Sequence, residues 1–484
     1  MTTIKLDPGA ALLLDALHGA GHAAYAVGGC VRDSLLGLAP HDWDLCTSAR
    51  PEQVMALFGE EKCIPTGLQH GTVTVKQGGR LYETTTFRTE GAYSDGRHPD
   101  AVCFVPDVRE DLARRDFTIN AMAYSAEEGL IDPFGGRDDL AAHLVRAVGE
   151  PERRFEEDAL RILRLYRFAA RFGFAIDPAT GAAARALGPH LDCVSAERIQ
   201  EELLKLLAAP RPGSYLEPAV LAVILPELEP EKQPERFAEL CRTIDRIEPT
   251  AENVPARLAA LLWPLGEAGA RKALRKLKCS NALTDEVTAL EREAGGGAGS
   301  FLLGHEFELR HPADALCLER HSHPAVRCPN SNSLFPPQAA VVAVAGHSIA
   351  RPIACGNRVP PQRTVLGETP GTPNTTLTVQ AKRLLGRYEL PTIQRLTALC
   401  SARHPEQAGA FAALRAEAER LTAENACCRV SQLAVNGRDL MAAGVRPGPG
   451  LRQVLNALLE AVITGQTPNE KDALLAAAAQ FSAS

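Results

Sequence analysis

The sequence of 484 residues lacks several features that would assign it to a specialised class of protein. No apolar run approaches the roughly 20 residues that cross a bilayer, so we expect no membrane span. The thirteen cysteines form no C-x-x-C pair, which favours free thiols in a reducing cytoplasm. The N-terminus has no basic segment and Asp15 interrupts its first apolar run, so we expect no signal peptide.

An excess of basic charge is also missing, because the formal net charge is −7. This charge argues against a protein that simply coats nucleic acid, but it allows an enzyme with a locally basic surface. Aromatic residues make up only 5% of the chain, and the abundance of Ala and Leu favours helices. The length is sufficient for three or four domains.

Two kinds of pattern divide the chain. Residues 1–145 mix helical and strand patterns, and "GTVTVKQGGRLYETTTFRT" predicts two strands joined by a tight turn at Gly78 and Gly79. From about residue 150 the apolar residues are spaced as in helices. This change predicts an α+β N-terminal domain followed by helical domains.

One segment differs in composition from everything around it. Between His323 and Thr378 the chain has no Lys, no Asp and a single acid, Glu368, among many Pro, Val and Asn residues. Such a composition does not support a packed helical array. We expect a long, poorly ordered insertion over residues 311–378, although a shifted reading frame would give the same composition.

The stretch "HDWDLCTSARPEQV" places two acids, Asp42 and Asp44, on either side of a Trp. In a strand, both carboxylates would project from one face, roughly 6.5–7 Å apart at Cα. That spacing suits a pair of divalent cations, and Mg²⁺ prefers carboxylate oxygens. Glu83, in a strand that can pair beside this one, is a candidate third catalytic acid. The simpler alternatives are an acidic turn and a surface glutamate.

The stretch "AVGGCVRDSLLG" lies just upstream of the two acids. Gly28 and Gly29 follow an apolar run and precede a predicted helix. Without side chains, they let the backbone approach a triphosphate closely, and the N-terminus of the helix favours phosphate. Arg32 can add a forked contact to phosphate. An ordinary strand–turn–helix would show the same two glycines.

A polar cluster interrupts the apolar pattern of "EDLARRDFTINAMAY". Arg115 and its neighbour Arg114 suit phosphate oxygens, whereas Asp116 suits ribose hydroxyls and Asn120 belongs to the same cluster. We interpret these residues as part of a nucleotide site. A solvated turn with salt bridges is the alternative.

The stretch "EEDALRILRLYRFAARFGF" is predicted as one amphipathic helix. Asp158 and Arg161 are three residues apart, and Glu157 and Arg161 are four apart, so each pair shares a helix face. An acceptor beside a donor can read the hydrogen-bonding edge of a base. Further arginines at helical spacing can line a groove for an RNA backbone: Arg164, Arg167 and Arg171. An ordinary ion-pair helix is the alternative.

Taken together, these motifs resemble the class II tRNA nucleotidyltransferases of the bacterial CCA-adding type. The resemblance rests on "GGCVRD", "HDWDLCTSA", "TTFRTEGAYSDGRHPD", "EDLARRDFTINAMAY", "EDALRILRLYRFAARFGF" and "VNGRDLMAAGVRPGPG". It implies a polymerase-β-like palm followed by helical neck, body and tail domains. The corresponding boundaries are 1–145 for the palm, 146–212 for the neck, 213–310 for the body and 379–484 for the tail.

The resemblance also implies a function for each motif. Asp42 and Asp44 would bind two Mg²⁺ ions during addition of C, C and A to the 3′ end of tRNA from CTP and ATP. Asp158 and Arg161, with Glu157 nearby, would form an amino-acid template for these nucleotides. Arg115 and Asp116 would orient the nucleotide, "EGAYSDGRHPD" would switch from C to A, and the tail would hold tRNA. An A-adding enzyme, a poly(A) polymerase and a non-catalytic RNA-binding relative are the alternatives.

Overall fold

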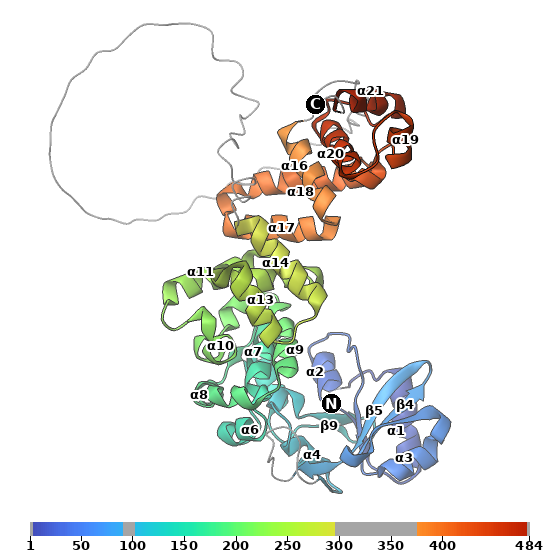
Figure 1. Ribbon diagram of the computed structural model, residues 1–484. Coiled ribbons are helices and arrows are strands. Elements are labelled where there is room, and N and C mark those ends of the chain that lie inside the picture. Colours follow the sequence, from blue (N-terminus) through green and yellow to red (C-terminus); the bar gives the residue numbers. More distant parts are fainter. Residues whose placement is uncertain (1–2, 91–101, 296–374, 482–484) are drawn as a thin grey trace, which may run out of the picture. The chain divides into compact units, whose positions relative to one another are not determined.

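The computed structural model describes residues 3–90, 102–295 and 375–481. The chain forms two compact units, of which the first combines Met1–Gly304 with Thr375–Leu433. The described part of the second unit is 434–481. The first unit carries a sheet followed by helices (Figure 1), which confirms the predicted α+β class.

A seven-stranded mixed sheet forms the N-terminal, palm region. Its strand order is β3-β4-β5-β2-β1-β8-β9, in which β2 and β5 are parallel and the other neighbours are antiparallel. Gly78 and Gly79, both at positive φ, close the predicted hairpin between β4 and β5. The strands are β1 Ala24–Val27, β2 Leu45–Thr47, β3 Cys63–Gly67, β4 Thr72–Gln77, β5 Arg80–Thr86, β8 Ala123–Ser125 and β9 Gly129–Ile131.

Both faces of this sheet are covered. Alternate residues of β1 point to opposite sides: Ala24 and Ala26 join the core shared with α1, whereas Tyr25 and Val27 join a smaller core under α4. The short strands β6 Arg88–Glu90 and β7 Val102–Phe104 pair with each other. The helices of this region are α1 Pro8–Gly19, α2 Gly29–Leu35, α3 Pro51–Phe58, α4 Val108–Ala113 and α5 Gly136–Ala141.

The rest of the first unit is almost entirely helical. Two short strands, β10 Leu144–Val145 and β11 Ala175–Ile176, pair in parallel. The first precedes α6 and the second follows α7. The helices in the regions predicted as neck and body are α6 Pro151–Glu157, α7 Leu160–Phe172, α8 Pro178–Ala186, α9 Ala196–Leu207, α10 Pro218–Ile224, α11 Pro234–Arg246, α12 Val254–Leu262, α13 Gly266–Lys276 and α14 Asn281–Gly295.

Three later helices complete this unit: α16 Thr376–Arg387, α17 Leu390–Arg403 and α18 Ala408–Ala423. Helix α17 packs on α12 and α14 of the body, although the sequence analysis assigned residues 379–484 to the tail. The atypical segment 311–378 lies outside the described residues up to 374, and α16 begins within its last residues. The domain boundaries therefore remain predictions.

The described part of the second unit contains three helices, α19 Gly437–Ala442, α20 Pro449–Thr464 and α21 Lys471–Phe481. Asn436 caps α19 by accepting hydrogen bonds from the N–H groups of Arg438 and Asp439. Leu458 and Leu474 are fully buried between the helices. Among the described residues of both units, no helix is long and apolar enough to cross a membrane.

Candidate active site

The two acids of the D-x-D motif lie just before β2 and not within it. Strand β1 ends at Val27 because Gly28, at φ 77°, turns the chain into α2. Strand β2 begins only at Leu45, opposite Ala26, so the expectation of a strand spanning both acids is wrong. A backbone hydrogen bond of 3.0 Å from Val27 N to Asp44 O still holds the motif beside the glycine turn.

Asp44, directly before β2, lies beside Glu83 in the middle of the neighbouring strand β5. Leu45 pairs with Thr84 in parallel register, which places the preceding residues of both strands side by side. The predicted position of Glu83 beside the D-x-D motif is thus confirmed. Desolvation by surrounding protein raises the pKa of Asp44, the Glu83 carboxylate raises it further, and Arg115 opposes both.

Asp42 projects into solvent, with 82% of its side chain exposed. Its Oδ1 is hydrogen-bonded to His41 Nδ1 at 2.9 Å, and its charge also raises the pKa of Asp44. Within the ranges that the structure describes, no three His, Cys, Asp or Glu side chains surround a common point. The paired hard oxygens of Asp42 and Asp44 nevertheless suit a divalent cation that keeps water or phosphate as its other ligands.

The two glycines form the predicted strand–turn–helix. Gly28 caps α2, and its N–H donates to Met122 O at 3.0 Å. A Cβ on Gly28 would lie 2.7 Å from Arg115 Nη1, so this turn tolerates no side chain without moving that arginine. A Cβ on Gly29 would make only an ordinary contact, 3.6 Å from Arg32 Nη2. Their contact with phosphate remains a prediction.

Arg32 binds other protein groups instead of pointing out of the turn. It is 3% exposed, and its Nε donates to Asp33 Oδ1 at 2.8 Å. Its Nη1 donates to Asn120 Oδ1 at 2.5 Å, and its guanidinium lies over the ring of Phe172, 4.9 Å from the centroid. The expected forked contact to phosphate would have to replace these bonds.

Asp116 links the palm to the neck helix α7. Its Oδ2 accepts hydrogen bonds from Arg164 Nε at 2.8 Å and Nη2 at 2.5 Å. Its Oδ1 accepts from Asn120 Nδ2 at 3.0 Å and from the N–H of Phe117 at 2.8 Å. Burial alone would raise the pKa of Asp116, but Arg164 and Asn120 outweigh it and hold that pKa well below its ordinary value.

The predicted single helix around the template residues is interrupted. Helix α6 ends at Glu157, Asp158 is extended at φ −148°, and α7 begins at Leu160. The expectation that Asp158 and Arg161 share one helix face is therefore wrong. Arg161 instead donates from Nη1 to Glu157 Oε2 at 2.7 Å, as the four-residue spacing predicted, and from Nη2 to Arg114 O at 3.0 Å.

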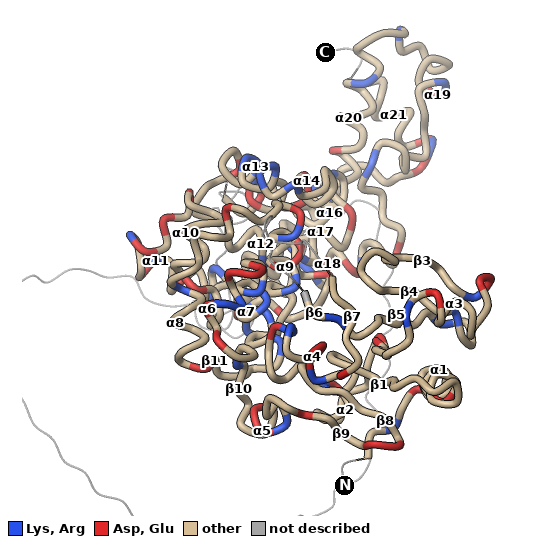
Figure 2. Tube along the Cα trace, turned by 90° about the horizontal axis from the view of Figure 1, so that it is seen from below, with Lys and Arg blue, Asp and Glu red and all other residues tan. Residues whose placement is uncertain are grey.

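The remaining arginines of α7 also have protein partners. Arg167 Nε donates to the buried Glu202 of α9 at 2.5 Å, and Arg171 Nη2 donates to Asp33 at 3.1 Å. Basic positions of α6 and α7 lie close together along the trace (Figure 2), with acidic positions among them. The pattern that predicted an RNA groove therefore corresponds mainly to ion pairs within the protein.

Two residues of this site were missed by the sequence analysis. Arg198 of α9 pairs with Asp158, and the fully buried Asp111 of α4 pairs with Arg114 and Arg115. Arg198 is forty positions from its partner, so no local spacing signals the contact. Asp111 stands directly before the analysed arginine cluster, and its spacing of three and four residues from the arginines was an available signal.

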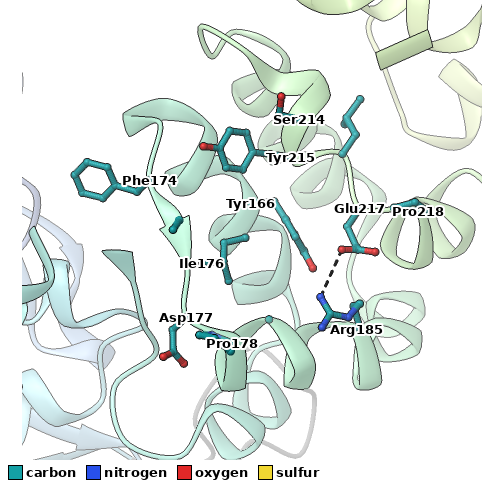
Figure 3. A pocket seen from close by; sticks show the side chains of 13 residues that line it. Tyr166, Phe174, Ile176, Asp177, Pro178, Arg185, Ser214, Tyr215, Glu217 and Pro218 are labelled. Carbon is teal, nitrogen blue, oxygen red and sulfur yellow. Dashed lines mark ion pairs between the residues drawn. The ribbon is translucent and has the colours of Figure 1, made fainter. Parts of the chain in front are cut away.

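A separate cavity of 640 Å³ lies beside α7, α8 and the turn before α10 (Figure 3). Tyr166, Ile176 and Tyr215 line it, and an Arg185–Glu217 ion pair of 3.7 Å borders it. None of the predicted site residues lines this cavity. The predicted loop "EGAYSDGRHPD" falls mainly on 91–101, outside the described residues.

Three regions of the chain match known families in order. Residues 24–146 match the "Poly A polymerase head domain" and 173–232 match the "Probable RNA and SrmB- binding site of polymerase A". Residues 392–478 match "tRNA nucleotidyltransferase domain 2 putative". Together with the sheet and its acids, these matches define a nucleotidyltransferase that acts on RNA.

Known CCA-adding enzymes are similar to this chain over nearly its whole length. The CCA-adding enzyme of Lactiplantibacillus plantarum is 32% identical over 96% of this chain and 93% of its own. That of Levilactobacillus brevis is 33% identical over 96% of both. The CCA-adding enzyme of Leuconostoc citreum is 44% identical over 252 residues, which span 60% of that protein. The chain therefore belongs to the CCA-adding enzyme family of tRNA nucleotidyltransferases.

Solved structures show the same fold. The CCA-adding enzyme of Bacillus stearothermophilus, solved in complex with CTP, is 30% identical with a TM-score of 0.68, over 98% of both chains. The Thermotoga maritima enzyme, solved with tRNA, has a TM-score of 0.62 at 20% identity. The first match confirms the predicted palm followed by helical regions.

Proposed function

We propose that this chain completes the 3′ end of tRNA by adding C, C and A from CTP and ATP. Membership in the CCA-adding enzyme family supports this activity. The observation that carries the proposal is the hydrogen bond from Val27 N to Asp44 O. It joins the D-x-D motif to the start of the glycine turn, so acids for a metal and backbone for a triphosphate meet at one point.

Asp42 and Asp44 are the proposed ligands of Mg²⁺, with Glu83 as the third acid. The carboxylates repel one another, since Glu83 and Asp42 both raise the pKa of Asp44, and a divalent cation would relieve this repulsion. When bound, Mg²⁺ would stabilise charge on the attacking 3′-hydroxyl and on the departing pyrophosphate. Hard carboxylate oxygens are the ligands that this ion prefers.

The nucleotide would lie along the glycine turn. Gly28 and Gly29 leave the backbone open to the phosphates, and Arg115 lies directly over Gly28. Asp116 is held by Arg164 and Asn120 with its pKa lowered, so it stays ionised. A ribose hydroxyl would donate to this carboxylate in place of one of its present donors. Arg32 donates a hydrogen bond to Asn120, which in turn donates to Asp116, and so helps to hold Asp116 in place.

Base selection is assigned to Asp158 and Arg161. An acceptor and a donor held by separate partners can each face the edge of a base. Glu157 holds Arg161, and Arg198 holds Asp158. Arg167 then acts indirectly, because its bond to Glu202 ties α7 to α9, which carries Arg198.

The proposed reaction forms one bond and breaks another at the same phosphorus. The 3′-oxygen of tRNA bonds to the α-phosphorus of CTP or ATP, and the bond from that phosphorus to the β-phosphate oxygen breaks. Pyrophosphate leaves, and the hydroxyl proton passes to solvent. Little covalent chemistry falls to the protein, so positioning and charge stabilisation by these side chains account for the rate.

The cysteine residues indicate the cellular compartment of the enzyme. The ten described cysteines are free thiols, and in eight of them burial is the main cause of a raised pKa. Unpaired thiols are stable in a reducing compartment, so we place the enzyme in the cytoplasm. The partner would be tRNA, which the helices after residue 375 would help to hold.

A transfer assay tests the proposal. Purified protein and Mg²⁺ are incubated with three tRNA transcripts that end before CCA, after the first C and after CC. CTP and ATP are supplied singly and together. Growth of all three to a CCA end, and no further, is the expected result. Extension of only the CC-ended tRNA indicates an A-adding enzyme, a long A tract indicates a poly(A) polymerase, and no extension favours a non-catalytic RNA-binding protein.

Variants of the two acids test the site within the same assay. Asp42→Ala and Asp44→Ala should each reduce transfer at least about 100-fold while the thermal unfolding curve keeps its shape. The matched control is Asp15→Ala, which removes an exposed acid of α1 in the same domain. Transfer retained by either of the first two variants would exclude the metal assignment.

A further inference from the structure

Asp111 is a buried acid with one carboxylate oxygen in use and one unused. It is fully buried on α4. Its Oδ1 accepts hydrogen bonds from Arg114 Nε at 3.0 Å and Nη2 at 2.9 Å, and from the N–H of Arg88 at 3.3 Å. Its Oδ2 is buried and has no hydrogen-bond partner in the part of the chain that the structure describes. This oxygen lies 3.6 Å from Arg115 Nη2.

Among the described ion pairs of Asp111, Arg115 is the partner of this Oδ2, whereas Arg114 pairs with Oδ1. The Nε of Arg115 is also buried without a hydrogen-bond partner in the described ranges. Its Nη1 lies against the backbone of Gly28, where a Cβ would stand 2.7 Å away.

Arg115 thus lies between a buried anion on one side and the glycine turn on the other. A long, flexible arginine side chain loses much rotamer freedom when it is fixed, so something must hold it there. The two glycines of the turn have no side chain that could hold it. A carboxylate fixed by Arg114 and withdrawn from solvent attracts a second guanidinium strongly, because few water molecules screen the pair.

We propose that Asp111 is a positioning residue that holds Arg115 across the glycine turn, ready to receive the triphosphate of the incoming nucleotide. The proposal rests on the function proposed above, in which the turn binds CTP and ATP. Arg114 fixes the carboxylate and Asp111 orients Arg115, while 21% of the Arg115 side chain stays exposed for the ligand. Asp111 itself touches neither substrate nor metal.

A double-mutant cycle distinguishes this action from a general structural role. Asp111→Asn keeps the shape and the acceptor for Arg114 but removes the charge that faces Arg115. It should raise the KM for both CTP and ATP roughly tenfold, with kcat changed less than about threefold. In an Arg115→Met background the same change should have almost no further effect on KM, because the residue through which it acts is absent.

A matched control is Glu293→Gln in the body. Glu293 is also buried and also pairs with an arginine, Arg387, at 3.2 Å, but it lies outside the palm. It should leave the KM for both nucleotides unchanged in either background. Asp111→Glu, which keeps the charge, should restore part of the KM. If Asp111→Asn fails to fold, Asp111→Ser, which also removes the charge, takes its place in the cycle.

Two results would overturn the proposal: an unchanged KM in Asp111→Asn, or an equal rise in KM in the presence and absence of Arg115. Loss of transfer by the unmodified protein would instead contradict the proposed function. In that case the four proteins of the cycle are compared by calorimetric titration with CTP and Mg²⁺. Non-additive loss of CTP binding would still support the role of Asp111, whereas additive loss or no loss would reject it.

Discussion

Arg198 of α9 donates hydrogen bonds to both carboxylate oxygens of Asp158, from Nη1 to Oδ1 at 3.2 Å and from Nη2 to Oδ2 at 2.7 Å. Oδ1 also accepts from the N–H of Leu160 at 3.0 Å. The carboxylate is therefore fixed from two elements at once. Arg161, the proposed donor, is fixed by other groups, so the two template residues are held independently.

We expect Arg198→Ala to relax nucleotide selection more than it slows transfer. Without Arg198 the Asp158 carboxylate is free to rotate, and its hydrogen bond to a base loses direction. The preference for CTP and ATP over UTP and GTP should fall roughly tenfold, as measured by kcat/KM for each nucleotide on matched tRNA ends. Arg185→Ala, which breaks a surface ion pair on α8, is the control and should leave selectivity unchanged.

An Arg198→Ala variant with the selectivity of the unmodified protein would contradict a template role for an oriented Asp158. Asp158→Ala and Arg161→Ala provide the upper limit of the effect. Each removes one half of the template, so each should lose at least as much discrimination as Arg198→Ala.

Gly28→Ala should raise the KM for nucleotides, whereas Gly78→Ala should not. Both glycines have positive φ, 77° and 58°, so alanine strains both by roughly 1 kcal/mol. Only at Gly28 does the new methyl group meet another residue, Arg115 Nη1 at 2.7 Å, and nothing lies within 4 Å at Gly78. Comparable losses in unfolding temperature with a higher KM only in Gly28→Ala are the expected outcome. Equal KM values would show that the turn does not position Arg115.

Local patterns in the sequence predicted the elements that local forces determine. The strand entering Gly28, the hairpin turn at Gly78 and Gly79, and the strand that carries Glu83 all follow from residue types a few positions apart. Each depends on a glycine at positive φ or on β-branched residues in alternation. These local patterns can be recognised without knowing which other parts of the chain pack against them.

Contacts between distant residues explain what the sequence did not predict. The helical spacing of residues 157–174 continues through Asp158, yet the chain is extended there and Asp158 pairs with Arg198, forty positions away. The arginines of α7 look like a basic stripe until α9 and α2 bring Glu202 and Asp33 against them. An ion pair across the fold leaves no periodic signal in either segment.

Removal of divalent metal should abolish transfer and lower stability through the same two acids. Chelation with EDTA should stop the reaction, and Mg²⁺ should restore it, because two neighbouring carboxylates are needed to hold the ion. Mg²⁺ should also raise the unfolding temperature, since a ligand that binds only the native state stabilises it. This rise should disappear in Asp42→Asn and Asp44→Asn but persist in Asp15→Asn. A full rise in a variant that combines Asp42→Asn with Asp44→Asn would show that the metal binds elsewhere.

We expect the buried Glu291 of α14 to make the stability of the protein depend on pH. Both of its carboxylate oxygens are buried without a hydrogen-bond partner in the described ranges. Burial raises its pKa to about 8, Glu267 adds to the shift, and Arg403 opposes it. The folded state therefore keeps the proton while the unfolded state loses it near the ordinary pKa of 4.5. Folding must take up this proton at any pH between the two values, and stability falls as the pH rises through that window.

Glu291→Gln should remove this dependence, because the amide resembles the protonated acid at every pH. Near pH 5 the variant and the unmodified protein should unfold at similar temperatures. By pH 8 the variant should be more stable by a few kcal/mol, which corresponds to several degrees in unfolding temperature. Thermal unfolding at half-unit steps from pH 5 to 8.5 measures the difference, with the exposed Glu235→Gln of α11 as control. A constant difference across this range would show that Glu291 is ionised in the folded protein and that Arg403 compensates its charge.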